Sequence, residues 1–227
     1  MKRLLPLLVV IFIGCACLGH QGIDTAFIDA ATDIRPATVL VKTLPAGVLD
    51  LEENWCFGSG VIISKSGHIL TCFHVVDRRQ KIVVVDLSTE EYDAELVAGN
   101  PFTDVAVLKI SHPEGENFCY AELGDSDALM PGQWVIASGA PAAFRDSITA
   151  GVISCLNPDN FPTWIQMDVA INPGSSGGPI CTLDGKVIGL ACAIVNPSPF
   201  RAYAGISFAI PINTAKDVLR DFEIDYP

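Results

Sequence analysis

The chain has 227 residues, of which 50% are hydrophobic, and its formal net charge at pH 7 is -12. This length suits one compact unit or two small barrels that share an interface, and it is too short for such a unit plus a second full module. The acidic charge matches nucleic acid and anionic lipid poorly, so we expect neither as a partner. Such a surface ordinarily aids solubility, and attraction of basic substrates is the alternative.

The N-terminus has the pattern of an export signal. Lys2 and Arg3 are followed by an apolar stretch from Leu4 to Ile13, which is shorter than the roughly 20 apolar residues of a membrane span. We therefore predict a leader at residues 1–19 and an extracytoplasmic location: secreted, periplasmic or membrane-anchored. Two kinds of membrane anchoring stay open, an uncleaved apolar anchor and lipidation of Cys15, which follows a stretch that resembles a bacterial lipobox.

The rest of the chain alternates between short apolar runs and turn signals, which is typical of strands. Residues 20–33 are polar and weakly patterned, so we expect a lead-in segment there. About six apolar runs precede a break near residue 128, and they lie at 39–41, 60–63, 69–71, 81–87, 95–98 and 105–110. A second series follows the break, at 134–137, 147–156, 164–167, 178–181, 186–193 and 205–210.

This pattern predicts an all-β fold of two antiparallel six-stranded barrels, with boundaries at residues 34–127 and 128–227. Asp184-Gly185 between two runs indicates a hairpin turn. Only the end of the chain has a helical pattern. Asn213 or Thr214 is the expected cap of this short C-terminal helix, whose expected apolar face is Ala215, Val218, Leu219 and Phe222.

Six cysteines follow the leader, and we expect mostly buried thiols. Most lie in apolar strand-like runs, where a free cysteine behaves as a small hydrophobic residue. One or two disulfides remain compatible with export. Because no CxxC pair occurs and no Cys/His cluster has zinc spacing, the sequence predicts no metal site. The six are Cys56, Cys72, Cys119, Cys155, Cys181 and Cys192.

The strongest motif is the run Gly174-Ser175-Ser176-Gly177-Gly178. A serine hydroxyl is a weak nucleophile, which needs a base to take its proton and donors to hold the oxyanion. Glycines let the backbone turn sharply, so the amides of Gly174 and Ser176 can point to one place as an oxyanion hole. Alone, such a glycine-rich turn is a plain loop about as often as it is functional.

His74 and Asp104 complete a candidate catalytic triad with Ser176. The run at 69–71 leads into His74, and Asp104 opens the run at 105–110. Either residue alone would more often be structural. Together the three occur in the order His, Asp, Ser, which is the order of the chymotrypsin class and not that of subtilisins or α/β-hydrolases.

Five ordered segments resemble the protease domain of the HtrA/Deg family of trypsin-like serine proteases. The resemblance covers about residues 34–220, and Ser175 and Cys72 depart from the usual family residues, Asn and a polar side chain. We expect no PDZ segment after the terminal helix. The matching segments are 58–76, 103–109, 121–126, 170–179 and 205–211.

The resemblance implies a serine endopeptidase that acts on unfolded or damaged polypeptides in protein quality control, without a metal or organic cofactor. It also implies a homotrimer, since family members often work as trimers. The alternative function is that of a binding or chaperone module that kept the fold as an inert or latent protease.

The segment before the nucleophile predicts the specificity of the pocket. Ala170, Ile171 and Ala193 are the expected lining, and the loop to Gly205 is expected to close it. This lining offers no counter-charge to Lys or Arg, and burying an unpaired cation is costly, so we expect cleavage after small or medium apolar residues. We expect Asp168 to be structural.

Overall fold

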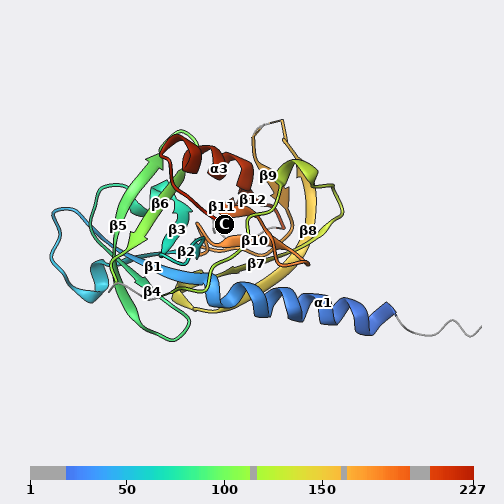
Figure 1. Cartoon of the computed structure of the whole chain (residues 1–227), viewed down its shortest axis with the longest axis horizontal. Coiled ribbons are helices and arrows are strands. Elements are labelled where there is room, and N and C mark those ends of the chain that lie inside the picture. Colours follow the sequence, from blue (N-terminus) through green and yellow to red (C-terminus); the bar gives the residue numbers. More distant parts are fainter. Residues whose placement is uncertain (1–18, 113–116, 160–162, 195–204) are drawn as a thin grey trace, which may run out of the picture.

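The computed structural model describes residues 19–112, 117–159, 163–194 and 205–227. It consists of two closed antiparallel barrels that lie side by side (Figure 1). Strand order is β1-β2-β3-β6-β5-β4 in the first barrel and β10-β11-β12-β9-β8-β7 in the second. The predicted all-β fold of two six-stranded barrels is confirmed.

Each predicted apolar run forms a strand. In the first barrel the strands are β1 (Thr38–Pro45), β2 (Cys56–Ile62), β3 (His68–Cys72), β4 (Arg79–Val85), β5 (Glu91–Asn100) and β6 (Val105–Ile110). In the second barrel they are β7 (Trp134–Gly139), β8 (Ser147–Leu156), β9 (Ile165–Met167), β10 (Pro179–Thr182), β11 (Val187–Ile194) and β12 (Ser207–Pro211).

The barrel interiors are filled by apolar side chains. Val41, Ile69 and Leu108 share one face of the first barrel and pack in its core, and Ile153 and Met167 pack in the core of the second. The run Val105-Ala106-Val107-Leu108 is buried at every position because α3 covers the outer face of β6. The hairpin prediction is also correct, since Gly185 has a φ of +80° in the turn that joins β10 and β11.

The expectation that only the end of the chain is helical is wrong. Gly19–Ile34 forms α1, which contacts β7 and β10 of the second barrel (Figure 1). Phe27, Ala30 and Ile34 lie three or four residues apart, so they share one face, and Ala30 and Ile34 are each 1% exposed. The ring of Phe27 meets that of Trp134 edge-on at 5.4 Å. Polar residues between these positions conceal the pattern in the sequence.

The predicted C-terminal helix is α3 (Ile212–Asp221), but its cap is not where we expected it. The helix begins at Ile212, after Pro211, and no side chain caps it, so Asn213 and Thr214 lie inside its first turn. Ala215, Val218 and Leu219 are buried as predicted. Phe222 follows the helix and is 50% exposed, so that part of the predicted apolar face is wrong.

The described cysteines carry free thiols, and no disulfide joins two of them. Cys72 and Cys181 are buried, whereas Cys56 and Cys119 are exposed. None of the helices in the described part of the chain is long and apolar enough to cross a membrane. The predicted leader, including Cys15, lies outside the described residues except for Gly19.

Candidate active site

The short helix α2 (Phe73–Val76) places His74 directly after β3, and the turn before β6 places Asp104 beside it. His74 Nδ1 lies 2.6 Å from Asp104 Oδ2, and the backbone amide of His74 donates to Asp104 Oδ1 at 2.8 Å. The amide of Phe73 donates to the carbonyl oxygen of Asp104 at 2.9 Å. Asp104 thus holds the first turn of α2 through three acceptors.

The surroundings of Asp104 favour its ionised form. Burial opposes ionisation, but hydrogen bonds from the ring and amide of His74 and from the thiol of Cys192 outweigh it and lower the pKa of Asp104. Its backbone adopts a φ of +57°, a left-handed conformation that aspartate tolerates better than most residues. This geometry holds the imidazole with its other nitrogen, Nε2, free to act on a substrate.

The serine motif lies in the turn between β9 and β10 of the second barrel, and two of its glycines are needed for their backbone conformation. Gly174 has a φ of +100°, and a Cβ there would lie 2.5 Å from the carbonyl oxygen of Ala140. Gly177 has a φ of +85°, and a Cβ there would collide with Thr71 and Ser59. Among the described residues, no acceptor pairs with the amides of Gly174 and Ser176, so both remain available to an oxyanion.

Ser59 on β2 fastens this turn to the first barrel, and sequence reasoning missed it. Its hydroxyl donates to the carbonyl of Gly174 at 2.7 Å and accepts from the amide of Ala140 at 2.9 Å. Its own amide donates to the carbonyl of Ser176 at 2.8 Å, and Thr71 Oγ1 donates to its carbonyl at 2.7 Å. The sequence shows that Ser59 lies between Gly58 and Gly60, but it does not show the burial or the partners of this serine.

The two adjacent serines have different surroundings. The Ser176 hydroxyl donates to the carbonyl of Cys192 at 3.3 Å, and the thiol of Cys192 donates to Asp104 Oδ2 at 3.4 Å. Ser176 is therefore linked to the His74–Asp104 pair through one residue. The Ser175 hydroxyl accepts from the amide of Asn172 at 3.3 Å, and Ser175 is 7% exposed. This buried position favours Ser176 over Ser175 as the nucleophile.

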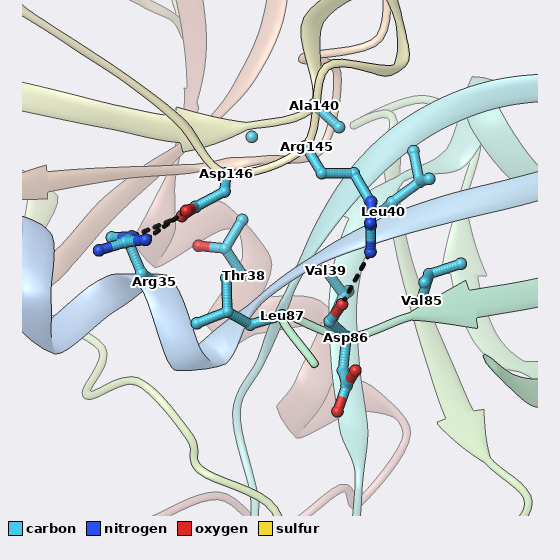
Figure 2. Close-up of a pocket in the computed structure, with 11 residues that line it drawn as sticks. Arg35, Thr38, Val39, Leu40, Val85, Asp86, Leu87, Ala140, Arg145 and Asp146 are labelled. Atoms are coloured by element: carbon cyan, nitrogen blue, oxygen red, sulfur yellow. Dashed lines mark hydrogen bonds and ion pairs between the residues drawn. The ribbon is translucent and has the colours of Figure 1, made fainter. Parts of the chain in front are cut away.

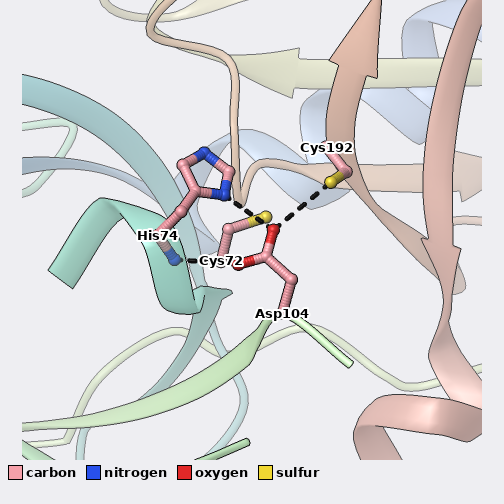
Figure 3. Close-up of side chains that lie close together, drawn as sticks. All are labelled: Cys72, His74, Asp104 and Cys192. Atoms are coloured by element: carbon pink, nitrogen blue, oxygen red, sulfur yellow. Dashed lines mark hydrogen bonds and ion pairs between the residues drawn. The ribbon is translucent and has the colours of Figure 1, made fainter. Parts of the chain in front are cut away.

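Cys72 and Cys192 flank the His74–Asp104 pair (Figure 3). The Cys72 thiol is fully buried and donates to the carbonyl of Ala191 at 3.4 Å. A hydrogen bond with Cys192 and burial raise the pKa of Cys72 well above its ordinary value. This cluster could not be predicted from residue spacing, because Cys192 lies on the other barrel.

The residues predicted to line the substrate pocket do not all line the same hollow. Ala170 and Ile171 line a small hollow with Ser175 and Thr149, but Ile171 is only 3% exposed and Ala193 does not line it. The loop expected to close the pocket, residues 195–204, lies outside the described residues. Asp168 Oδ1 accepts from the amide of Val152 at 2.6 Å, which agrees with a structural role.

A separate hollow lies where the segment 140–146 meets the first barrel (Figure 2). Arg35 forms an ion pair with Asp146 there, and Arg145 donates to the carbonyl of Asp86 at 3.4 Å. The same segment reaches the serine turn, since the amide of Ala142 donates to the carbonyl of Pro173 at 2.7 Å. None of the candidate triad residues lines this hollow.

Two six-stranded barrels, with a His–Asp pair on the first and a glycine-rich serine turn on the second, define the trypsin-like class of proteins. The chain belongs to the trypsin-like peptidase domain family, whose model matches residues 58–190. The resemblance to the HtrA/Deg proteases is likewise confirmed by individual relatives.

Two of these relatives are called "Probable periplasmic serine endoprotease DegP-like". The chain is 47% identical over 171 residues to the one from Halomonas elongata and 45% identical over 172 residues to the one from a Marinomonas species. Each match covers 74% of this chain, and 35% and 36% of the relatives. The chain thus spans about a third of their length.

Among solved structures, the HtrA-type protease AlgW with a tripeptide is similar to this chain, with a TM-score of 0.77 and 33% sequence identity. That match covers 88% of this chain and 64% of the solved one.

Proposed function

We propose that this protein is a serine endopeptidase that hydrolyses polypeptides through a covalent acyl-enzyme. The observation that carries this proposal is the 2.6 Å contact between His74 Nδ1 and Asp104 Oδ2, with the turn that bears Ser176 fastened beside it. The names of the relatives support the same activity. In this proposal the reaction uses no metal or organic cofactor.

The mechanism follows from the roles that each group can take. Ser176 Oγ attacks the peptide carbonyl while His74 Nε2 takes its proton, and His74 later returns that proton to the leaving amine. Asp104 accepts a hydrogen bond from Nδ1–H and stabilises the imidazolium that forms. The amides of Gly174 and Ser176 hold the oxyanion, at about 3 kcal/mol for each donor.

A latent form of this enzyme is the second candidate, because of one specific observation. The Ser176 hydroxyl donates to the carbonyl of Cys192 at 3.3 Å instead of to His74. Catalytic hydrogen bonds are often loose without substrate, so a rotation of the Ser176 side chain can align it when a peptide binds. An inert chaperone or binding module would keep the same arrangement without turnover.

Labelling with a fluorophosphonate probe tests the proposal directly, because the probe reacts with an activated serine. We expect one adduct, mapped by mass spectrometry to Ser176. The matched controls are Ser176→Ala, which should not react, and Ser175→Ala, which should. No adduct on the folded wild-type chain, with or without added peptide, would contradict the endopeptidase proposal and leave the inert module.

The proposed substrates are unfolded or damaged polypeptides. The proposed compartment is extracytoplasmic, which the word periplasmic in the names of the relatives supports. We further propose cleavage after Val, Ala, Ile or Leu. Asp168 Oδ1 accepts a hydrogen bond from the Val152 amide, which favours a structural role for this carboxylate, and Ala170 itself offers no counter-charge to a basic side chain. Mass spectrometry of fragments from a denatured protein tests this specificity. Predominant cleavage after Arg or Lys would contradict it.

A further inference from the structure

Four side chains that can bind a metal converge at the candidate active site: Cys72, His74, Asp104 and Cys192 (Figure 3). Their ligand atoms all lie within 4.8 Å of one another. Cys72 ends β3, His74 lies on α2 and Asp104 precedes β6, whereas Cys192 comes from β11 of the other barrel. Only the docking of the two barrels brings these four residues together.

The donor set suits one particular ion. Zinc prefers four tetrahedral ligands, takes thiolate, imidazole and carboxylate donors, and places them roughly 3.3 to 3.8 Å apart. The two closest atoms, His74 Nδ1 and Asp104 Oδ2, are 2.6 Å apart and would have to separate by about 1 Å. The side chain of His74 is 49% exposed, so it has room to turn.

We infer that Cys72, His74, Asp104 and Cys192 form a binding site for Zn²⁺, and that zinc bound there reversibly inhibits the enzyme. The two thiols release their protons to solvent, and the imidazole proton moves from Nδ1, which becomes a ligand, to Nε2. An imidazole protonated at Nε2 cannot accept the proton of Ser176. Binding does not depend on the proposed function, whereas the inhibition rests on it.

The burial of the cluster is consistent with reversible binding. Cys72 is fully buried and Cys192 is half-buried, while the side chains of His74 and Asp104 are 49% and 23% exposed. Zinc can therefore reach the cluster from the side of His74. The same face must admit a peptide substrate, so zinc and substrate compete for access to His74.

A binding experiment tests the site without any need for activity. The full chain with Ser176→Ala is titrated with Co²⁺, a coloured probe for zinc sites, in the presence of a reductant that contains no thiol. We expect a thiolate-to-cobalt charge-transfer band that saturates at one equivalent and disappears when Zn²⁺ is added. When the Ser176→Ala chain also carries Cys72→Ala, the band should disappear. Cys192→Ser in the same chain is a second variant with the same expected result.

The exposed cysteines provide the matched control. The double variant Cys56→Ser and Cys119→Ser should keep the cobalt band, since these two thiols are exposed and lie outside the cluster. Absence of a band in the parent chain would overturn the proposal. The proposal would also be overturned if the cobalt band were lost in the Cys56→Ser, Cys119→Ser variant but kept in Cys72→Ala.

An activity experiment tests the inhibition. Saturating Zn²⁺ should lower the turnover of the active chain by between about 10²- and 10⁴-fold, the usual contribution of a general base, and a chelator should restore it. Cys72→Ala, compared with its own zinc-free rate, should lose most of this sensitivity. Equal inhibition of Cys72→Ala would overturn the inference by showing that zinc acts elsewhere. A chain without turnover that still shows the cobalt band would contradict the proposed function alone.

Discussion

Ser59 and Gly174 belong to different barrels, and the hydroxyl of Ser59 donates to the carbonyl oxygen of Gly174 at 2.7 Å. The same hydroxyl accepts from Ala140, and Ser59 has no exposed surface. The serine turn, which carries the proposed oxyanion donors Gly174 and Ser176, is therefore held in part by a residue of the other barrel. We propose that Ser59 is a positioning residue.

Replacement of Ser59 by alanine should lower both stability and kcat. The change leaves the buried amide of Ala140 and the partly buried carbonyl of Gly174 without this partner, which costs about 1–3 kcal/mol of the free energy of unfolding. A loosened Gly174 amide should lower kcat by about 10- to 100-fold, with a smaller effect on KM. Urea unfolding and steady-state kinetics measure the two effects.

Ser64→Ala is the matched control for that experiment. Ser64 is also a buried serine of the first barrel, and its hydroxyl accepts from the amide of His68 at 3.0 Å. It makes no contact with the serine turn among the hydrogen bonds described. Equal losses of kcat in both variants would mean that stability alone explains the effect of Ser59.

The two neighbouring serines should respond very differently to replacement. Ser176→Ala should lower kcat by about 10⁴-fold or more, because removing one member of a triad disables the others. Ser175→Ala should lower kcat far less, because the Ser175 hydroxyl is buried and accepts a hydrogen bond from the amide of Asn172. Peptide hydrolysis assays of both variants make the comparison. The reverse ranking would make Ser175 the nucleophile.

A change at Asp104 should alter how stability depends on pH. The pKa of Asp104 is lowered in the folded chain, so its charge stabilises the fold above the ordinary aspartate pKa of about 3.9. That contribution disappears as the pH falls through the lower, folded value. The stability that wild type gains over Asp104→Asn should therefore be smaller at pH 3 than at pH 5. A difference that is the same at pH 5 and pH 3 would contradict the lowered pKa.

Two buried threonines of the first barrel form a natural pair of tests. Thr43 Oγ1 has no hydrogen-bond partner among the described residues, whereas Thr71 Oγ1 donates to Ser59 at 2.7 Å. Thr43→Val should be neutral or stabilising by up to about 1 kcal/mol, because it removes an unpaired buried hydroxyl. Thr71→Val should destabilise by about 1–3 kcal/mol. Thermal unfolding ranks them, and equal destabilisation would contradict this account.

The ion pair between Arg35 and Asp146 should affect catalysis from a distance. It holds a segment that includes Ala142 at a φ of +49° and Ala143 at +63°, conformations that a loose loop would avoid. The amide of Ala142 orients the peptide before Gly174 through the carbonyl of Pro173. Arg35→Gln should therefore lower kcat several-fold. Arg220→Gln, which breaks the exposed pair with Asp217 on α3, is the control and should leave kcat unchanged.

Much of the fold was predictable because apolar runs of strand length between turn residues rarely form anything but β-strands. The order of the motifs predicted that His74 and Asp104 lie together, but it did not predict the distance between their side chains or their other partners. The helix α1 was missed because its apolar face is narrow, with Ala30 at its centre. The roles of Ser59 and of the cluster of Cys72, His74, Asp104 and Cys192 could not be predicted, because they depend on how one barrel docks against the other.

Each terminal helix contacts the barrel that is more distant from it in sequence, and α3 also contacts β11 and β12 of the barrel that it follows. α1 precedes the first barrel but packs on β7 and β10, and α3 follows the second barrel but reaches back to β5 and β6 (Figure 1). Each helix therefore connects the two barrels, whose interface contains the His–Asp pair and the serine turn. Separation of the barrels would break the contacts of α1 with β7 and β10 and those of α3 with β5 and β6. We therefore expect the two barrels to unfold in a single cooperative transition.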